Sequence, residues 1–153
     1  MRAVLLALSF GDSYESNKNI LDEIRRNVLI YSDPYIITDR NIGVYLMSEV
    51  KEENIYIIPG EQCRTLLSTI RAGLKKIKLL KRADLYLITA LPIAHRSRQI
   101  LKHLAPWLMV YSRFVEAGYN RRDQRWRARY LVWSYFIEPF LFFIPWPLYK
   151  RWG

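Results

Sequence analysis

The chain has 153 residues, of which 51% are hydrophobic, so it can build one domain with a substantial core but hardly two. Its 24 lysines and arginines against 14 acidic residues give a net charge of +10. This excess favours anionic partners such as nucleotides, nucleic acid, phosphorylated substrates or lipid headgroups. Cys63 is the only cysteine, which excludes an intramolecular disulfide and fits a reducing cytoplasm. The first apolar stretch, residues 3–8, is too short for a secretory signal or a membrane anchor, so we expect neither.

Apolar runs of strand length alternate along the chain with segments of helical period. The pattern is typical of a parallel sheet covered by helices. We expect strands near residues 3–8, 28–31, 55–58, 85–88 and 108–111. We expect helices near residues 15–26, 39–50, 61–82 and 93–105. The predicted fold is a three-layer, doubly wound (Rossmann-like) α/β domain with a mainly parallel five-stranded sheet.

The third expected helix carries an apolar stripe and a basic stripe at the same helical spacing. The apolar stripe consists of Leu67, Ile70, Leu74 and Ile77, and the basic one of Arg71, Lys75, Lys78 and Arg82. Between Arg64 and Arg82 the sequence has seven basic residues and no acidic one. The basic stripe either binds a polyanion or simply faces water, and a solvated face is the favoured interpretation.

The composition changes at residue 113, so we divide the chain into an α/β core, residues 1–112, and a basic and aromatic segment, residues 113–153, packed on the same domain. The segment has five arginines between Arg121 and Arg129, followed by nine aromatic residues within residues 130–149. Glu138 and three prolines within that run argue against a membrane-spanning helix. We expect an aromatic-rich helix near residues 122–143 that covers one face of the sheet. Docking of residues 130–149 on a membrane surface or on a partner is the alternative.

Polar residues follow the predicted strands, where loops and helix amino termini meet. Ligands of open parallel sheets bind in the crevice beyond the carboxyl ends of the strands. The residues predicted there are Ser9, Gly11 and Asp12; Ser32 and Asp33; Gly60, Glu61, Arg64 and Thr65; Thr89, His95 and Arg98; and Ser112 and Arg113. We therefore predict a ligand site at this edge.

The fourth expected helix places His95, Arg98 and Lys102 on one face, because they are spaced i, i+3 and i+7. A phosphate or carboxylate near the start of this helix would meet backbone N–H groups and a guanidinium together. Taken alone, a histidine in the first helical turn is more often a cap or a surface residue.

Several other chemistries have little support in the sequence. Cys63 and His95 could form a nucleophilic pair, but a lone cysteine near a helix start is usually buried filler. His95, His103 and Cys63 show no recognised metal-ligand spacing, so we predict no metal site. The chain also lacks a G-x-G-x-x-G dinucleotide fingerprint, a P-loop motif and a G-x-S-x-G elbow.

The residues TALPIAHRSR, 89–98, resemble the strand, turn and His-x-x-Arg signature of the SanA, YdcF and ElyC family, with His95 and Arg98 in the signature places. Thr65 resembles the threonine of the family's Asn-Thr pair, and Ser32 the serine of its Ser-Gly-Gly turn. Residues 50–59, VKEENIYIIP, and Glu138 are also similar to family segments. The resemblance implies a doubly wound α/β fold, in a family of mostly unknown biochemistry with several members linked to the bacterial envelope.

Two hypotheses of different class remain. In the first, the domain binds, and as an enzyme would transform, an anionic nucleotide-like or phosphorylated small molecule. A nucleotide-like ligand such as S-adenosylmethionine is the candidate cofactor. Ser9, Gly11, Ser32, Asp33, Arg64, Thr65, Thr89 and Arg98 would then bind the ligand, and His95 would be the general acid or base oriented by Asp12 or Glu61. In the second, the protein is a non-catalytic interaction protein that attaches to a membrane surface, nucleic acid or another copy of itself through its arginine cluster and aromatic tail. We expect a cytoplasmic protein, with a peripheral position at the membrane as the alternative.

Overall fold

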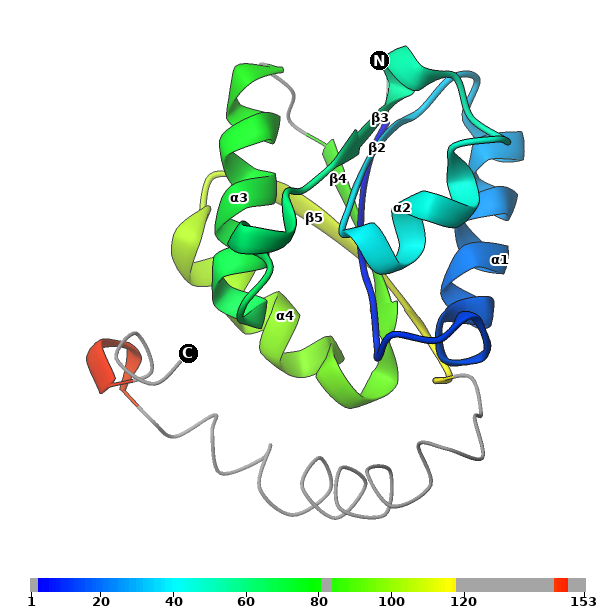
Figure 1. Ribbon diagram of the computed structural model, residues 1–153. Helices are drawn as coiled ribbons and strands as arrows, with labels where there is room; N and C mark the ends of the chain where they lie inside the picture. Colours follow the sequence, from blue (N-terminus) through cyan, green and yellow to red (C-terminus); the bar gives the residue numbers. More distant parts are fainter. Residues whose placement is uncertain (1–2, 81–83, 118–144, 149–153) are drawn as a thin grey trace.

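In the part of the chain that the structure describes, five parallel strands form the central sheet. The computed structural model describes residues 3–80, 84–117 and 145–148 (Figure 1). The strands lie in the order β3-β2-β1-β4-β5, and every neighbouring pair is parallel. Their bounds are β1 Val4–Leu8, β2 Tyr35–Thr38, β3 Ile55–Ile57, β4 Asp84–Ala90 and β5 Met109–Val115. The predicted three-layer, doubly wound α/β fold is confirmed.

Helices cover both faces of the sheet (Figure 1). The helices α1 (Tyr14–Ile30) and α2 (Arg40–Leu46) pack on one face, and α3 (Leu66–Leu79) and α4 (Leu91–Leu104) pack on the other. Two short 3-10 helices, η1 (Glu52–Asn54) and η2 (Gly60–Gln62), stand before and after β3. Because each crossover helix returns the chain to the same edge, all strands point one way and their carboxyl ends share one side of the molecule.

The core lies on both sides of the central strand β1. Its alternate residues divide between two buried clusters: Leu6 faces α3 and α4, and Leu5 faces α1 and α2. All five β1 residues are buried, which explains why the strand is apolar throughout instead of alternating with polar residues. The helices add their own apolar faces, for example Ile24 from α1 and Ile70 from α3.

One strand prediction is wrong. Residues 28–31, expected as the second strand, belong to the last turn of α1 and its C-cap, and β2 begins at Tyr35 instead. The helical spacing of Ile20, Ile24 and the buried Asn27 continues through this stretch, whereas Leu29 is 86% exposed. A short apolar run thus imitated a strand, although two of its side chains face solvent.

This shift moves Ser32 and Asp33 to the other side of the molecule. They lie between α1 and β2, at the amino edge of the sheet, and not beyond the carboxyl end of a strand. Asp33 has a positive φ of 65°, and its carboxylate accepts a hydrogen bond from the side chain of Asn54. These two residues therefore shape a turn at the edge opposite the predicted ligand site.

The predicted helix near residues 122–143 lies outside the described residues, as do the arginine cluster and most of the predicted docking segment 130–149. The described part of that segment is residues 145–148, where the Trp146 ring stacks on His103 of α4, with ring centroids 4.5 Å apart. At the other end, β5 runs to Val115, into the predicted C-terminal segment. None of the helices in the described part of the chain has the length and apolarity needed to cross a membrane.

Candidate functional site

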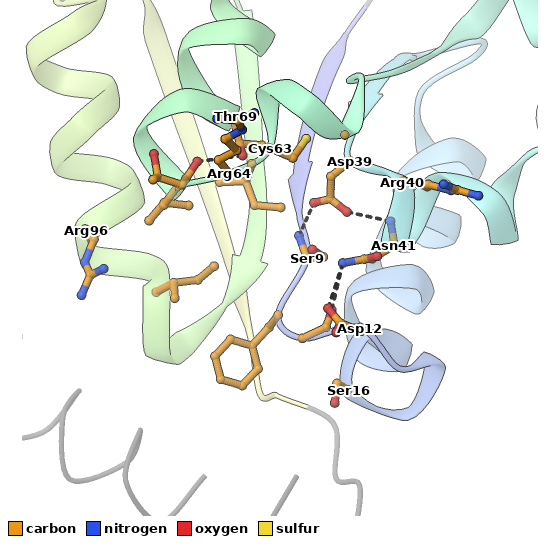
Figure 2. Close-up of a pocket in the computed structure, with 17 residues that line it drawn as sticks. Ser9, Asp12, Ser16, Asp39, Arg40, Asn41, Cys63, Arg64, Thr69 and Arg96 are labelled. Carbon is orange, nitrogen blue, oxygen red and sulfur yellow. Dashed lines mark hydrogen bonds between the residues drawn. The ribbon is translucent and has the colours of Figure 1, made fainter. Parts of the chain in front are cut away.

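A cavity opens at the carboxyl edge of the sheet, where the direction of winding changes. From β1 the chain winds outward through β2 and β3, then crosses to β4 on the other side of β1. Crossover points of this kind leave a crevice between diverging loops. The cavity has a volume of about 680 Å³ (Figure 2). Its lining residues are Leu8, Ser9, Phe10, Gly11, Asp12, Ser16, Asp39, Arg40, Asn41, Gly60, Cys63, Arg64, Thr65, Leu66, Thr69, Ile93 and Arg96.

The loop between β1 and α1 forms one wall of the cavity, and Asn17 fixes its shape. The buried Asn17 side chain accepts a hydrogen bond from the Phe10 N–H at 2.7 Å. Its amide group donates to the backbone carbonyls of Gly11 and Ser13, each at 3.0 Å. Gly11 has a φ of 82°, a left-handed conformation that glycine adopts without steric penalty. The Asn17 side chain thus fixes the shape of the loop through three hydrogen bonds.

Asp39 lies at the back of the cavity, directly after β2. Its side chain is 6% exposed and accepts hydrogen bonds from the N–H of Ser9 at 2.8 Å and of Asn41 at 3.0 Å. It is also the N-cap of α2, so it connects the ends of β1 and β2. Burial raises the pKa of this carboxyl group, and the two N–H donors oppose part of that rise.

Asn41 links the same two loops at the mouth of the cavity. Its side-chain amide lies 3.4 Å from the Gly11 carbonyl oxygen and 3.4 Å from Asp12 Oδ1 (Figure 2). Asp12 is exposed, so its carboxylate is available both to Asn41 and to solvent.

The third wall is the start of α3. Thr65 caps this helix, since its hydroxyl accepts the Ser68 N–H at 3.1 Å while the Ser68 hydroxyl accepts the Thr65 N–H at 3.0 Å. This capping box leaves the amides of Leu66 and Leu67 outside the hydrogen-bond ladder of the helix. Just before the cap, the Cys63 thiol lies 3.7 Å from the Ile58 carbonyl oxygen, and burial raises the pKa of this thiol.

Three arginines bring positive charge to the cavity, one from each of three different segments. Arg40 belongs to α2, Arg64 precedes α3, and Arg96 lies in the first turns of α4. In Figure 2, Arg40 and Arg96 lie on opposite sides of the cavity, with Asp39 between them. The N-cap of α4 is Ala90, which has no side-chain acceptor for the first amides of that helix. The cavity therefore combines guanidinium groups with helix amino termini.

The structure brings together six of the residues predicted at this edge and separates the others. The predicted residues that line the cavity are Ser9, Gly11, Asp12, Gly60, Arg64 and Thr65. Thr89 is buried beneath it, with its hydroxyl 3.5 Å from the Leu8 carbonyl oxygen. Glu61 is exposed on η2 and does not line the cavity. Ser32 and Asp33 lie at the opposite edge of the sheet.

His95 and Arg98 are exposed on α4 and lie outside the cavity lining. The His95 ring lies near Phe114 of β5, with centroids 6.5 Å apart. The neighbouring Arg96 lines the cavity instead. Since Cys63 is in the lining and His95 is not, the structure does not show the nucleophilic cysteine and histidine pair that the sequence left open.

Among the lining residues that the sequence analysis did not place in the site, four carry a charged or amide side chain. Asp39, Arg40 and Asn41 were missed because the second strand was placed too early, so that the residues after it were the wrong ones. The signal was nevertheless present, since YIITDRN is an apolar run followed by an N-cap residue and a helix. Arg96 was missed because the predicted helix face was built on His95 and Arg98.

Among the residues that the structure describes, no three histidine, cysteine, aspartate or glutamate side chains are grouped so that they could hold a metal ion. No family model matches the chain, and neither a curated protein nor a solved structure is detectably similar to it. The resemblance to the SanA, YdcF and ElyC family therefore stays a prediction.

Proposed function

We propose that the protein binds an anionic, nucleotide-like or phosphorylated small molecule in the cavity at the carboxyl edge of its sheet. The observation that carries this proposal is the convergence of Arg40, Arg64 and Arg96 with the amino termini of two long helices around one cavity. A volume of about 680 Å³ is in the usual range for small-molecule sites.

The charges of the lining favour an anion. Among the described residues, the lining contains three arginines and two aspartates, Asp12 and Asp39, and burial disfavours the ionised form of Asp39. Guanidinium groups bind phosphate or carboxylate through paired hydrogen bonds. The first-turn amides of α3 would add N–H donors for the same group.

The apolar part of the lining favours a ligand with more than a charged group. Phe10 from the loop after β1, Leu66 from α3 and Ile93 from α4 contribute apolar surface to the cavity. A base, a ring or an acyl portion would bury apolar area against these side chains, whereas inorganic phosphate would leave them in water. This composition supports a nucleotide-like molecule over a free inorganic anion.

The acidic side of the cavity suits hydroxyl or amino groups of such a ligand. Asp12 and Asn41 lie together at its mouth, on the side away from Arg96 (Figure 2). Ribose hydroxyls or the amino group of S-adenosylmethionine would find acceptors there. The proposal is limited to binding, because His95, the predicted general acid or base, does not line the cavity.

The test is a thermal-stability screen with ATP, ADP, AMP, S-adenosylmethionine and inorganic phosphate. At a ligand concentration about 100 times Kd, we expect at least one nucleotide-like compound to raise the Tm by about 5 °C or more. The Arg64→Ala/Arg96→Ala protein should lose this shift, measured against its own ligand-free Tm.

The matched control is Arg71→Ala/Arg98→Ala, which removes two exposed arginines from the same layer outside the cavity. It should keep the full ligand-induced shift. The proposal is wrong if no compound shifts the wild-type Tm, or if both double variants lose the shift equally. Loss in the control alone would favour the predicted His95 and Arg98 site instead.

A further inference from the structure

Positive charge is concentrated in one layer of the molecule. Together α3 and α4 contain seven lysines and arginines and no aspartate or glutamate. On the other face of the sheet, α1 alone contains three basic and three acidic residues. Because α3 and α4 pack side by side on the same face (Figure 1), their basic residues belong to one continuous layer.

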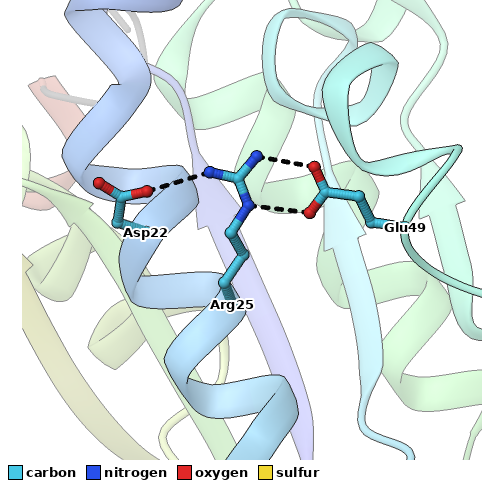
Figure 3. Close-up of polar contacts among 3 residues, drawn as sticks. All are labelled: Asp22, Arg25 and Glu49. Atoms are coloured by element: carbon cyan, nitrogen blue, oxygen red, sulfur yellow. Dashed lines mark hydrogen bonds and ion pairs between the residues drawn. The ribbon is translucent and has the colours of Figure 1, made fainter.

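The two layers also differ in how their basic residues are neutralised. On α1, Arg25 donates to both oxygens of Glu49 at 2.7 and 2.8 Å and to Asp22 at 3.0 Å (Figure 3). Within the described residues, no carboxylate forms an ion pair with Arg71, Lys75 or any of the other exposed basic residues of α3 and α4. These others are Lys78, Arg98 and Lys102. Within the described residues, ion pairs therefore do not neutralise the positive charge of this layer.

Large apolar side chains are exposed at the end of the same layer that lies away from the cavity. Leu79, in the last turn of α3, is 77% exposed. It continues the helix face of Arg71 and Lys75, since the three residues are spaced four positions apart. Trp107, just after α4, is 60% exposed. Exposed basic and apolar side chains thus both occur in the carboxyl-terminal halves of α3 and α4 and directly after them, at one corner of the molecule.

We propose that this corner, formed by the carboxyl-terminal halves of α3 and α4, docks on an anionic lipid surface. Lysines near an anionic membrane are attracted by its surface potential, while tryptophan and leucine insert at the boundary between headgroups and acyl chains. Nucleic acid would satisfy the lysines but would offer no apolar phase to Leu79. The combination therefore favours lipid over a nucleic acid.

The proposed docking corner does not include the cavity, but docking would set the orientation of the cavity relative to the lipid surface. Thr65 at the start of α3 lines the cavity, and Leu79 ends the same helix. A 14-residue helix is about 21 Å long, so the cavity would open roughly that far from the docked corner. A molecule bound at the lipid surface would keep its cavity open to the aqueous phase.

The test is co-sedimentation of the full chain with phosphatidylcholine vesicles, with and without a quarter of phosphatidylglycerol. We expect binding to the anionic vesicles only, and Lys75→Glu/Lys78→Glu to weaken it about tenfold or more. Leu79→Ser/Trp107→Ser should reduce the binding that persists at high salt, since the apolar contribution is not screened. The thermal melt of each variant confirms that it is folded.

The matched control is Lys18→Glu/Lys51→Glu, which changes the net charge by the same amount on exposed lysines outside α3 and α4. It should bind the anionic vesicles nearly as well as the wild type. The proposal is overturned if the wild type does not prefer anionic vesicles, or if this control weakens binding as much as Lys75→Glu/Lys78→Glu. Binding to a single-stranded oligonucleotide but not to the anionic vesicles would also overturn it.

Discussion

Asp39 is the residue on which the geometry of the cavity depends most. It receives one N–H from the end of β1 and one from the start of α2, so both of its oxygens are used. An asparagine at this position could accept only one of the two bonds, since its amide nitrogen is a donor. The same carboxyl group is buried and has a raised pKa.

We expect Asp39→Asn to destabilise the protein and to change its pH dependence. Near pH 4, the buried N–H left without an acceptor should lower the free energy of unfolding by about 1–3 kcal/mol. A carboxyl group with a raised pKa binds its proton more tightly in the folded state, so its contribution to stability declines as the pH rises through the raised pKa.

The difference in the free energy of unfolding between the wild type and Asp39→Asn should therefore become smaller as the pH rises above the ordinary carboxyl pKa. Urea unfolding at a series of pH values measures both effects, with the exposed Asp12→Asn as the control. If this difference instead increases with rising pH, the two N–H donors have a larger effect on the pKa of Asp39 than burial has.

At the scale of single residues, the sequence predicted those cavity residues that follow a correctly predicted strand. Ser9, Gly11 and Asp12 were found because β1 is unmistakably apolar, and Arg64 and Thr65 because they follow the third strand, which was also placed correctly. Their convergence on one cavity follows from parallel strands alone. Of His95, Arg96 and Arg98 on α4, only Arg96 lines the cavity. The choice among them depends on the rotation of the helix about its axis, which the sequence does not determine.

Among the elements, α1 and the segment after α2 are joined by the bidentate Arg25 and Glu49 pair (Figure 3). The hydrogen bond from Arg25 lowers the pKa of Glu49. A lowered pKa contributes stability at pH values above the ordinary carboxyl pKa, and this contribution is lost as the pH falls through the lowered value. Both side chains are more than a third exposed, so solvent screening keeps the effect small.

We expect Glu49→Gln to lower the free energy of unfolding by about 0.5 kcal/mol at neutral pH and low salt. The difference should shrink in high salt, and it should disappear as the pH falls through the lowered pKa of Glu49, where the wild-type carboxylate becomes protonated as well. Chemical denaturation measures it, with the exposed Glu53→Gln as the control. If the difference in the free energy of unfolding is unchanged at high salt, packing and not charge stabilises the contact between α1 and the segment after α2.

Four of the five strands were predicted close to their observed positions, because apolar runs of strand length are specific when turn residues bound them. The exception, residues 28–31, shows the limit of the method. Four consecutive apolar residues suit a buried strand as well as the end of an amphipathic helix, and only tertiary packing decides between them. Because of that single error, Ser32 and Asp33 were predicted at the carboxyl edge of the sheet, whereas they lie at the amino edge.

For the whole molecule, the structure gives the two ends of the α3 and α4 layer different properties. One end carries the cavity with its helix amino termini, and the other carries exposed lysines and apolar side chains. The strand order creates the first, because the crossover at β1 opens a crevice at the carboxyl edge. The absence of acidic residues from α3 and α4 creates the second.

The most direct measurement is a ¹H–¹⁵N NMR titration with the compound that stabilises the protein most. We expect the amide signals of residues 9–12, 39–41 and 64–69 to shift together with one common Kd. The signals of Ser32 and Asp33, at the opposite edge, should stay in place. Shifts confined to the amino edge, or no shifts around the cavity at saturating ligand, would contradict the proposed site.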